Sequence, residues 1–344
     1  MKSRFFFAFL PWVAVATSSL AWDYAGHRAV NQIALAALPD DFPAFVRQAD
    51  AAERIAFLAG EPDRWRNVPD LPIRHANGLD HYCDLEFIPE AGLEVTSLSS
   101  LRYEFAMAFA AGRAAHPENF APIDPAKNAD RTREWPGFAP WAITEAYGKL
   151  RSAFSYLKVY QELGTPDEIA NAQANAIYIM GVMGHFVGDL AQPLHTTKHH
   201  NGWVGENPHG YTETGGIHAW IDGGFFAKVG LPVEALAARA QPAAPVSMSA
   251  RSDRRDPVFA AVIDYFVAQH AEVERLYQLE KDGKFKADDD GGWRDGAEFL
   301  QGQLLRGGQM LAALWLTAWR DTVPDVYLRA SLLRRQGIDT PVAK

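Results

Sequence analysis

The sequence predicts an all-α protein with a single, mainly helical domain. Apolar residues recur at helical spacing through most of the chain, alternation typical of strands is nearly absent, and neither a repeat period nor a low-complexity tract divides the sequence. Because amphipathic helices bury their apolar stripes against one another, this pattern favours packed helices around one core. We expect the domain to span residues 22–344.

The first 21 residues have the features of a secretory signal peptide. Lys2 and Arg4 precede an apolar run over residues 5–16, and small residues stand just before Trp22. The run is too short to span a bilayer, and no later segment offers the ~20 apolar residues of a membrane-spanning helix. We expect a secreted or periplasmic chain that begins at Trp22, without stable membrane insertion. The alternative is an uncleaved N-terminal anchor.

Composition limits the function further. The net charge of −9 falls to −11 when Lys2 and Arg4 are removed, which argues against a protein that coats DNA with a broad basic surface. An anionic substrate therefore needs a local positive centre. The only cysteine is Cys83, so no intrachain disulfide can form.

Helical patterns follow one another along the chain. They cover residues 22–37, 42–58, 100–115, 141–163, 166–192, 217–229, 257–281, 293–320 and 323–334. The helices 141–163 and 166–192 are joined by Gly164-Thr165, which predicts an antiparallel pair. We expect loops at 67–84, a polar, Pro-rich surface excursion at 118–140, a Gly-, Asn- and His-rich loop at 196–216 and a connection at 241–256.

The end of the predicted helix 166–192 carries candidate metal ligands. His185 and Asp189 are four residues apart, so they project from one face of the helix. Pro193 should end the helix near Gln192 and place His195 separately but close by. The alternative is an ordinary polar helix end, with a capping aspartate and two surface histidines.

Histidines and aspartates at other helix ends and junctions extend this set. His218 and Asp222 form a second pair with the same spacing. The candidates are His27, Asp63, His81, His185, Asp189, His195, His218 and Asp222. Zn²⁺ takes imidazole and carboxylate ligands where thiolates are absent, so this composition favours zinc.

Several segments resemble the motifs of the S1/P1 nuclease family, in the family's order and with its local spacings. They are Trp22-Asp23-Tyr24-Ala25-Gly26-His27, Asp63 with Arg66, His81-Tyr82-Cys83-Asp84, residues 185–195 and His218-Ala219-Trp220-Ile221-Asp222, with a weaker likeness at Gly307-Gly308. The resemblance implies a helical domain of the phospholipase C/P1 nuclease type with three zinc ions per chain. The disulfides of the better-known members are absent here, and the stretches 118–140 and 196–216 do not look like the family pattern.

The resemblance also implies how the ligands divide among the ions. One zinc takes Asp63, His81, His185 and Asp189, and a second takes His195, His218 and Asp222. The third takes His27, Asp189 as a bridge, and the α-amino nitrogen and carbonyl oxygen of Trp22. Removal of the signal peptide would then complete the site, because Trp22 offers this chelate only as the first residue.

Four residues receive further roles from the resemblance. Asp63 would orient or deprotonate the attacking water and Arg66 would steady the charge on phosphorus, whereas the alternative for Arg66 is a salt bridge with Asp63 or Glu61. Tyr82 and Asp84 would form a pocket for a base. The alternative for this pair is a core tyrosine and an aspartate that caps a turn.

The expected function is a secreted zinc-dependent endonuclease and phosphodiesterase. It would cut single-stranded DNA and RNA to 5′-phosphorylated products, with 3′-nucleotidase activity beside this, and no obligate protein partner is evident. The rival is a zinc-dependent phospholipase C. The five-residue step from Trp22 to His27, and Asp222 where similar phospholipases carry glutamate, favour the nuclease. A periplasmic zinc-binding protein is the non-enzymatic alternative.

Overall fold

Two long antiparallel helices run through the middle of the molecule, α7 (Ala139–Leu163) and α8 (Pro166–Ala191). The computed structural model describes residues 22–249, 255–288 and 291–338; the predicted signal peptide lies outside these residues. Thr165 begins α8 with a capping box, because its hydroxyl accepts the N–H of Glu168 while the Glu168 carboxylate accepts the N–H of Thr165. The predicted antiparallel pair is confirmed.

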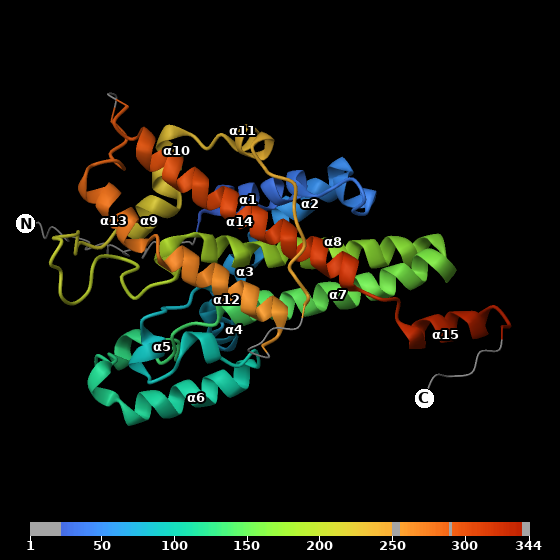
Figure 1. The fold of residues 1–344 in the computed structure, drawn as a ribbon, viewed down its shortest axis with the longest axis horizontal. Helices are drawn as coiled ribbons and strands as arrows, with labels where there is room; N and C mark the ends of the chain where they lie inside the picture. The colour runs from blue at the N-terminus through green and yellow to red at the C-terminus, as the bar shows by residue number, and fades with distance from the viewer. Residues whose placement is uncertain (1–21, 250–254, 289–290, 339–344) are drawn as a thin grey trace, which may run out of the picture.

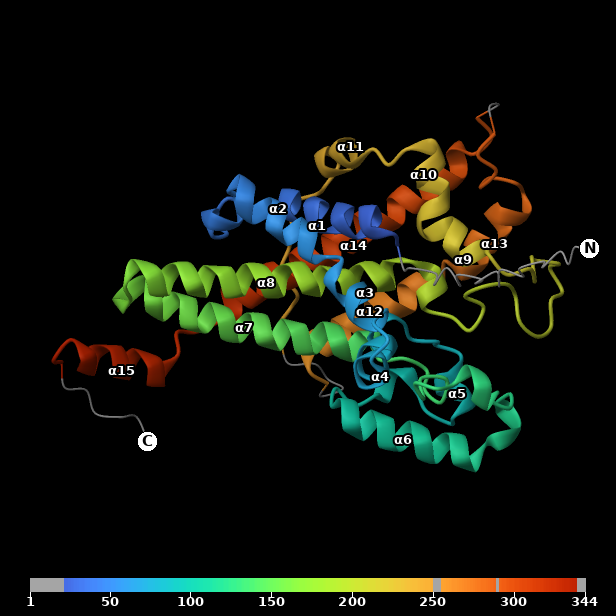
Figure 2. The same cartoon turned by 180° about the vertical axis from the view of Figure 1, so that it is seen from behind.

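A second layer lies against this pair. Helix α1 (Tyr24–Ala37) and helix α14 (Arg294–Asp321) pack on each other and on α8, and α2 (Ala49–Leu58) covers the next stretch of α8 (Figures 1 and 2). Gly308 of α14 faces α1 and Gly307 faces both α8 and α1, so these helices approach closely there. The apolar side chains of these helices form one continuous buried cluster.

Shorter elements surround these helices. They are η1 (Ala44–Arg47), α3 (Glu61–Arg66), α4 (Leu71–Gly78), η2 (Leu79–His81), α5 (Phe87–Glu90), η3 (Val95–Ser97), α6 (Arg102–Ala115), η4 (Pro117–Asn119), η5 (Pro125–Lys127), η6 (Pro193–His195), α9 (Ile217–Ala219), η7 (Trp220–Gly224), α10 (Phe225–Val229), α11 (Val233–Ala238), α12 (Pro257–His270), α13 (Val273–Lys281) and α15 (Val326–Arg335). Only two isolated β-bridges occur in the described residues, Cys83 with Gly137 and His200 with Gly202. The all-α prediction is confirmed.

Several predicted boundaries were wrong for local reasons. The helix predicted over 42–58 is divided at Gln48, whose backbone is extended. The loop predicted over 67–84 contains helix α4, because the Asp70 carboxylate accepts the N–H of Ile73 and a proline is tolerated in a first helical turn. The helix predicted over 257–281 is two helices that meet at residues 271–272.

The excursion predicted over 118–140 is only partly a surface feature. Its C-terminal end returns to the body, where Pro136 and Gly137 are buried. There the carbonyl of Pro136 accepts the N–H of Asp84 at 2.6 Å. Across the described residues, no helix has both the length and the apolar character needed to cross a membrane.

The close packing of α14 on α1 predicts opposite effects for two substitutions in one helix. A Cβ at Gly308 would lie 2.4 Å from the Ile33 Cγ2, whereas a Cβ at Gly302 would meet no atom within 4 Å. We expect Gly308→Ala to lower the free energy of unfolding by about 1–3 kcal/mol through overpacking. Gly302→Ala should raise it by roughly 0.5–1 kcal/mol, because alanine is the better helix former. Chemical denaturation measures both values, and a stable Gly308→Ala protein would contradict the packing of α14 on α1.

Candidate metal centre

The end of α8 projects His185 and Asp189 into one buried space. Both side chains are fully buried, and the His185 Nε2 lies 3.2 Å from the Asp189 Oδ2. The helix ends at Ala191, and Pro193 begins the short helix η6 that carries His195. His195 turns back toward the same space, since its Nδ1 donates to the carbonyl of His81 at 2.7 Å.

Five further elements bring the other candidate ligands to this place. The eight side chains come from α1 (His27), α3 (Asp63), η2 (His81), α8 (His185, Asp189), η6 (His195), α9 (His218) and η7 (Asp222). Their ligand atoms form three groups in which a metal ion could be held: His27 with Asp63 and His185, His81 with His185 and Asp189, and His195 with His218 and Asp222. Clusters of buried histidines and aspartates that could bind metal ions are therefore present.

These groups largely follow the ligand sets implied by the resemblance. The group of His195, His218 and Asp222 is one complete implied set. The group of His81, His185 and Asp189 is three quarters of another, and the Asp63 Oδ1 lies 3.9 Å from both the His81 Nδ1 and the His185 Nε2.

His27 shows one difference from the implied sets. Its Nε2 lies 3.6 Å from the Asp189 Oδ1, as the implied bridge requires. It is, however, also grouped with Asp63 and His185, and its ring stacks on that of His185 with centroids 3.9 Å apart.

Trp22 is anchored beside the same space. Its side chain is fully buried and stacks near Phe226, with ring centroids 6.4 Å apart. The N–H of the next residue, Asp23, donates to the carbonyl of the ligand candidate Asp222 at 3.0 Å. The backbone at Trp22 is therefore held close to the group that contains Asp222.

Backbone carbonyls select the tautomers of two imidazoles. The Nδ1 of His185 donates to the Ala59 carbonyl at 2.6 Å, so its Nε2 carries a lone pair when the ring is neutral. His195 is fixed in the same way by the carbonyl of His81. The His195 Nε2 then lies 3.0 Å from the His218 Nε2, and the His185 Nε2 lies 2.9 Å from the His81 Nδ1. Nitrogens this close require a shared proton or a cation between them.

Unpartnered polar atoms show that the cluster fits a cation. Buried atoms without a hydrogen bond include both ring nitrogens of His27, the Asp63 Oδ1, the His81 Nε2 and the Asp189 Oδ1. Buried polar atoms are otherwise almost always paired, because leaving one unpaired costs about 1–3 kcal/mol. Metal ions would satisfy the atoms that face the centre.

The buried carboxylates of Asp189 and Asp222 remain charged, because neighbouring imidazoles outweigh the effect of burial and lower the pKa of both. Burial alone would raise the pKa of Asp222, but the neighbouring imidazoles of His218 and His195 outweigh it and lower this pKa to about 2. Burial alone would lower the pKa of His195. The carboxylates of Asp189 and Asp222 outweigh this effect and raise the pKa to about 9. Burial lowers the pKa of His27 well below its usual value. The centre therefore attracts positive charge and also offers neutral imidazole nitrogen.

Arg66 and the pair Tyr82 and Asp84 lie at the edge of the cluster. The Arg66 Nε is 3.4 Å from the Asp63 Oδ1, so the alternative of a salt bridge with Asp63 is present, while Glu61 pairs with Arg64. Between Tyr82 and Asp84, the N–H of Cys83 donates to the His195 carbonyl at 2.9 Å. Asp84 is buried, and this burial, with Glu86 nearby, raises its pKa well above the usual value.

Gln192 is a positioning residue that the sequence motifs did not predict. Its Nε2 donates to the Asp222 Oδ1 at 2.6 Å, and its Oε1 accepts the N–H of Leu194 at 3.1 Å. The second contact fixes the orientation of the amide and leaves the Asp222 Oδ2 directed at His218, 2.9 Å away. A neutral amide is no metal ligand here, so a search for titratable side chains passes over it.

No family model, curated protein or solved structure matches the chain.

The contact between Gln192 and Asp222 predicts a selective loss of metal affinity. Gln192→Glu keeps the shape of the side chain but places a second carboxylate against Asp222, so we expect metal affinity to fall about 10–100-fold at the group of His195, His218 and Asp222. Titration with Zn²⁺ followed by calorimetry measures this. The control is Gln309→Glu, at an amide that contacts the carbonyl of Pro242. Equal affinities in both variants would exclude the positioning role.

Proposed function

We propose that this protein is a secreted zinc-dependent phosphodiesterase of the nuclease type. Its substrates would be single-stranded DNA and RNA, cut to 5′-phosphorylated products, together with 3′-nucleotides. One observation carries the proposal: five imidazoles and three carboxylates from seven separate elements meet in one buried space. The order and spacing of these residues along the chain resemble the S1/P1 nuclease family.

The donor set supports zinc as the metal. Imidazole nitrogen and carboxylate oxygen are the ligands that Zn²⁺ accepts in catalytic sites. The single cysteine, Cys83, is buried, and burial raises its pKa well above the usual value, so the thiolate form is disfavoured. Three ligand groups support as many as three ions per chain.

The charge of the centre supports an anionic substrate. Three Zn²⁺ ions with three ligand aspartates would leave a local charge of about +3 in a chain whose net charge is −9. Zinc bound here would polarise phosphodiester oxygens and lower the pKa of bound water. This local centre would attract phosphate without a basic surface.

Asp63 and Arg66 are placed to handle the proton and the charge of the reaction. Asp63 is 7% exposed and is the most accessible of the three ligand carboxylates. Its contact with Arg66 orients the carboxylate, which can accept a proton from the attacking water. The Arg66 guanidinium can hold a phosphate oxygen. Tyr82 and Asp84 follow the ligand His81 directly and would contact a base next to the scissile phosphate.

The implied chelate at Trp22 predicts that the mature N-terminus is part of the centre. Protein with one extra residue before Trp22 should bind fewer zinc ions than the protein that begins at Trp22, because Trp22 would no longer offer an α-amino nitrogen to the ion implied at His27 and Asp189. Elemental analysis should give about three zinc ions per mature chain. Equal zinc content in both proteins would contradict the N-terminal chelate.

A side-by-side assay tests the function itself. Zinc-loaded protein is offered single-stranded DNA, RNA, a 3′-nucleotide and phosphatidylcholine, and we expect hydrolysis of the first three. Asp63→Asn should lower kcat by about 10²–10⁴-fold, as expected for loss of a general base. The exposed Asp50 on α2 provides the control Asp50→Asn, which should retain full activity. Hydrolysis of the lipid alone would replace the nuclease by a phospholipase.

A further inference from the structure

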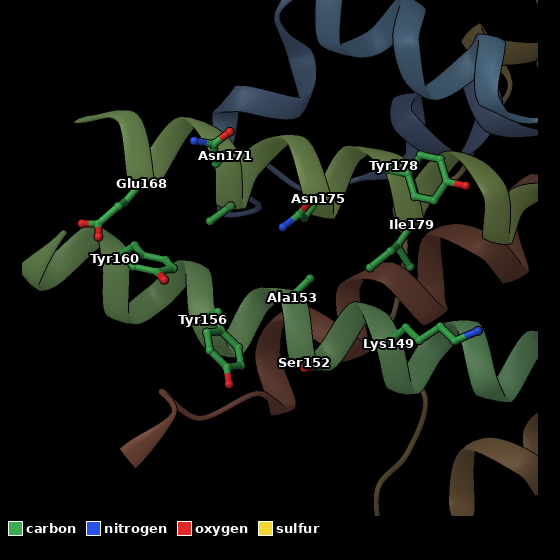
Figure 3. Close-up of a pocket in the computed structure, with 11 residues that line it drawn as sticks. Lys149, Ser152, Ala153, Tyr156, Tyr160, Glu168, Asn171, Asn175, Tyr178 and Ile179 are labelled. Atoms are coloured by element: carbon green, nitrogen blue, oxygen red, sulfur yellow. The ribbon is translucent and has the colours of Figure 1, made fainter. Parts of the chain in front are cut away.

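A groove runs along the helix pair α7 and α8, apart from the metal centre. Its volume is about 540 Å³. Figure 3 shows Tyr156 and Tyr160 of α7 on one side of it, and Asn171, Asn175 and Tyr178 of α8 on the other. Tyrosine faces in a groove can stack on unpaired bases, which a single strand offers and a duplex does not.

Three side chains of the groove, those of Lys149, Tyr156 and Tyr178, are free to bind. Tyr156 is 42% exposed and Tyr178 is 44% exposed, so a large part of each side chain is open to solvent. In the part of the chain that the structure describes, Lys149, Tyr156 and Tyr178 make no hydrogen bond or ion pair through their side chains. Such a groove offers aromatic faces, hydroxyl and amide groups and a free ammonium group, but no accessible unpaired carboxylate.

The one acidic residue of the groove is neutralised. The Glu168 carboxylate accepts two hydrogen bonds from Arg335 of α15, at 2.7 and 3.0 Å, and a third from the N–H of Thr165. Its negative charge is therefore balanced by a cation from another helix. The groove also contains one cation, Lys149, which makes no hydrogen bond or ion pair with the described residues, and this favours a ligand that carries negative charge.

The groove and the metal centre share helix α8. Tyr178 and the ligand candidate His185 lie on the same helix, seven residues apart, so roughly 10 Å separate them along the axis. On the opposite side of the groove, α7, which carries Lys149, packs on η2, the short helix that carries His81. One chain could therefore occupy both places, with its cleaved bond at the centre and a more distant segment in the groove.

We propose that the groove formed by Lys149, Tyr156, Tyr160, Asn171, Asn175 and Tyr178 binds the part of a single-stranded nucleic acid that flanks the scissile bond. Bases stack on the tyrosine rings and pair with the amides, and Lys149 contacts a phosphate. Because stacking is tolerant of sequence, the groove selects for strand length rather than for base. This inference rests on the proposed function, and it names long single strands as the preferred substrates.

Binding and hydrolysis test the groove separately. Zinc-loaded protein with Asp63→Asn is titrated with a fluorescent oligothymidine, so that the strand stays uncut, and anisotropy gives Kd. Tyr156→Ala and Tyr178→Ala should each raise Kd at least about fivefold, whereas Tyr156→Phe and Tyr178→Phe keep the ring and should bind normally. Tyr103 on α6 is 82% exposed and provides the matched control Tyr103→Ala. If the groove variants bind like Tyr103→Ala, the inference is overturned.

Kinetics of the otherwise unmodified protein separate this inference from the proposed function. The same tyrosine-to-alanine substitutions should raise KM for the oligonucleotide and leave KM for a dinucleotide unchanged, since a dinucleotide at the centre does not reach Tyr178. Equal changes for both substrates would contradict the groove while leaving the nuclease intact. Absence of any nucleic-acid hydrolysis by the unmodified protein would contradict the nuclease, and the anisotropy titration would still decide whether the groove binds the strand.

Discussion

The carboxylate of Asp189 is the point on which the structure of the centre depends. It is fully buried, and its oxygens lie 3.1–3.6 Å from nitrogens of four imidazoles, those of His27, His81, His185 and His195. A buried carboxylate is costly unless positive charge or hydrogen-bond donors surround it. Segments from four elements are thus held around one negative group, which places the remaining ligand candidates within reach.

Small residues make this convergence sterically feasible. A Cβ at Gly188 would lie 3.0 Å from the Nδ1 of His27, and a Cβ at Gly184 would lie 1.6 Å from the Oδ1 of Asn31. On α8, Gly184 directly precedes His185 and Gly188 directly precedes Asp189. The segment of α8 that carries these two ligand candidates can therefore pack closely against α1. Gly307 and Gly308 of α14 support α1 from the other side. Because α1 carries His27, the close packing of α1 also sets the position of this ligand candidate.

The two ends of helix α8 differ in their exposure to solvent. The C-terminal end of α8 is fully enclosed, and its side chains from Met180 to Ala191 are buried. Toward its N-terminal end the same helix is open, and Asn171, Asn175 and Tyr178 are exposed. Enclosure favours chemistry that needs desolvated charge, whereas an open groove favours reversible contacts with a long ligand. Helix α8 therefore connects the buried metal centre with the exposed groove.

The sequence by itself determined the helical class, the antiparallel pair and the end of α8 just before Pro193, because these depend on local spacing and on proline and capping chemistry. It also identified eight candidate ligands, from their residue types, from the spacing of two His/Asp pairs and from motifs that resemble a known family. It could not place Gln192 against Asp222 or bring Arg335 to Glu168, because these contacts join residues far apart in the chain and follow no local period. Only the tertiary structure decided which ligands form groups, which imidazole nitrogens face inward and where a free aromatic groove remains. Those features arise from how the helices pack, and local sequence patterns carry little information about that packing.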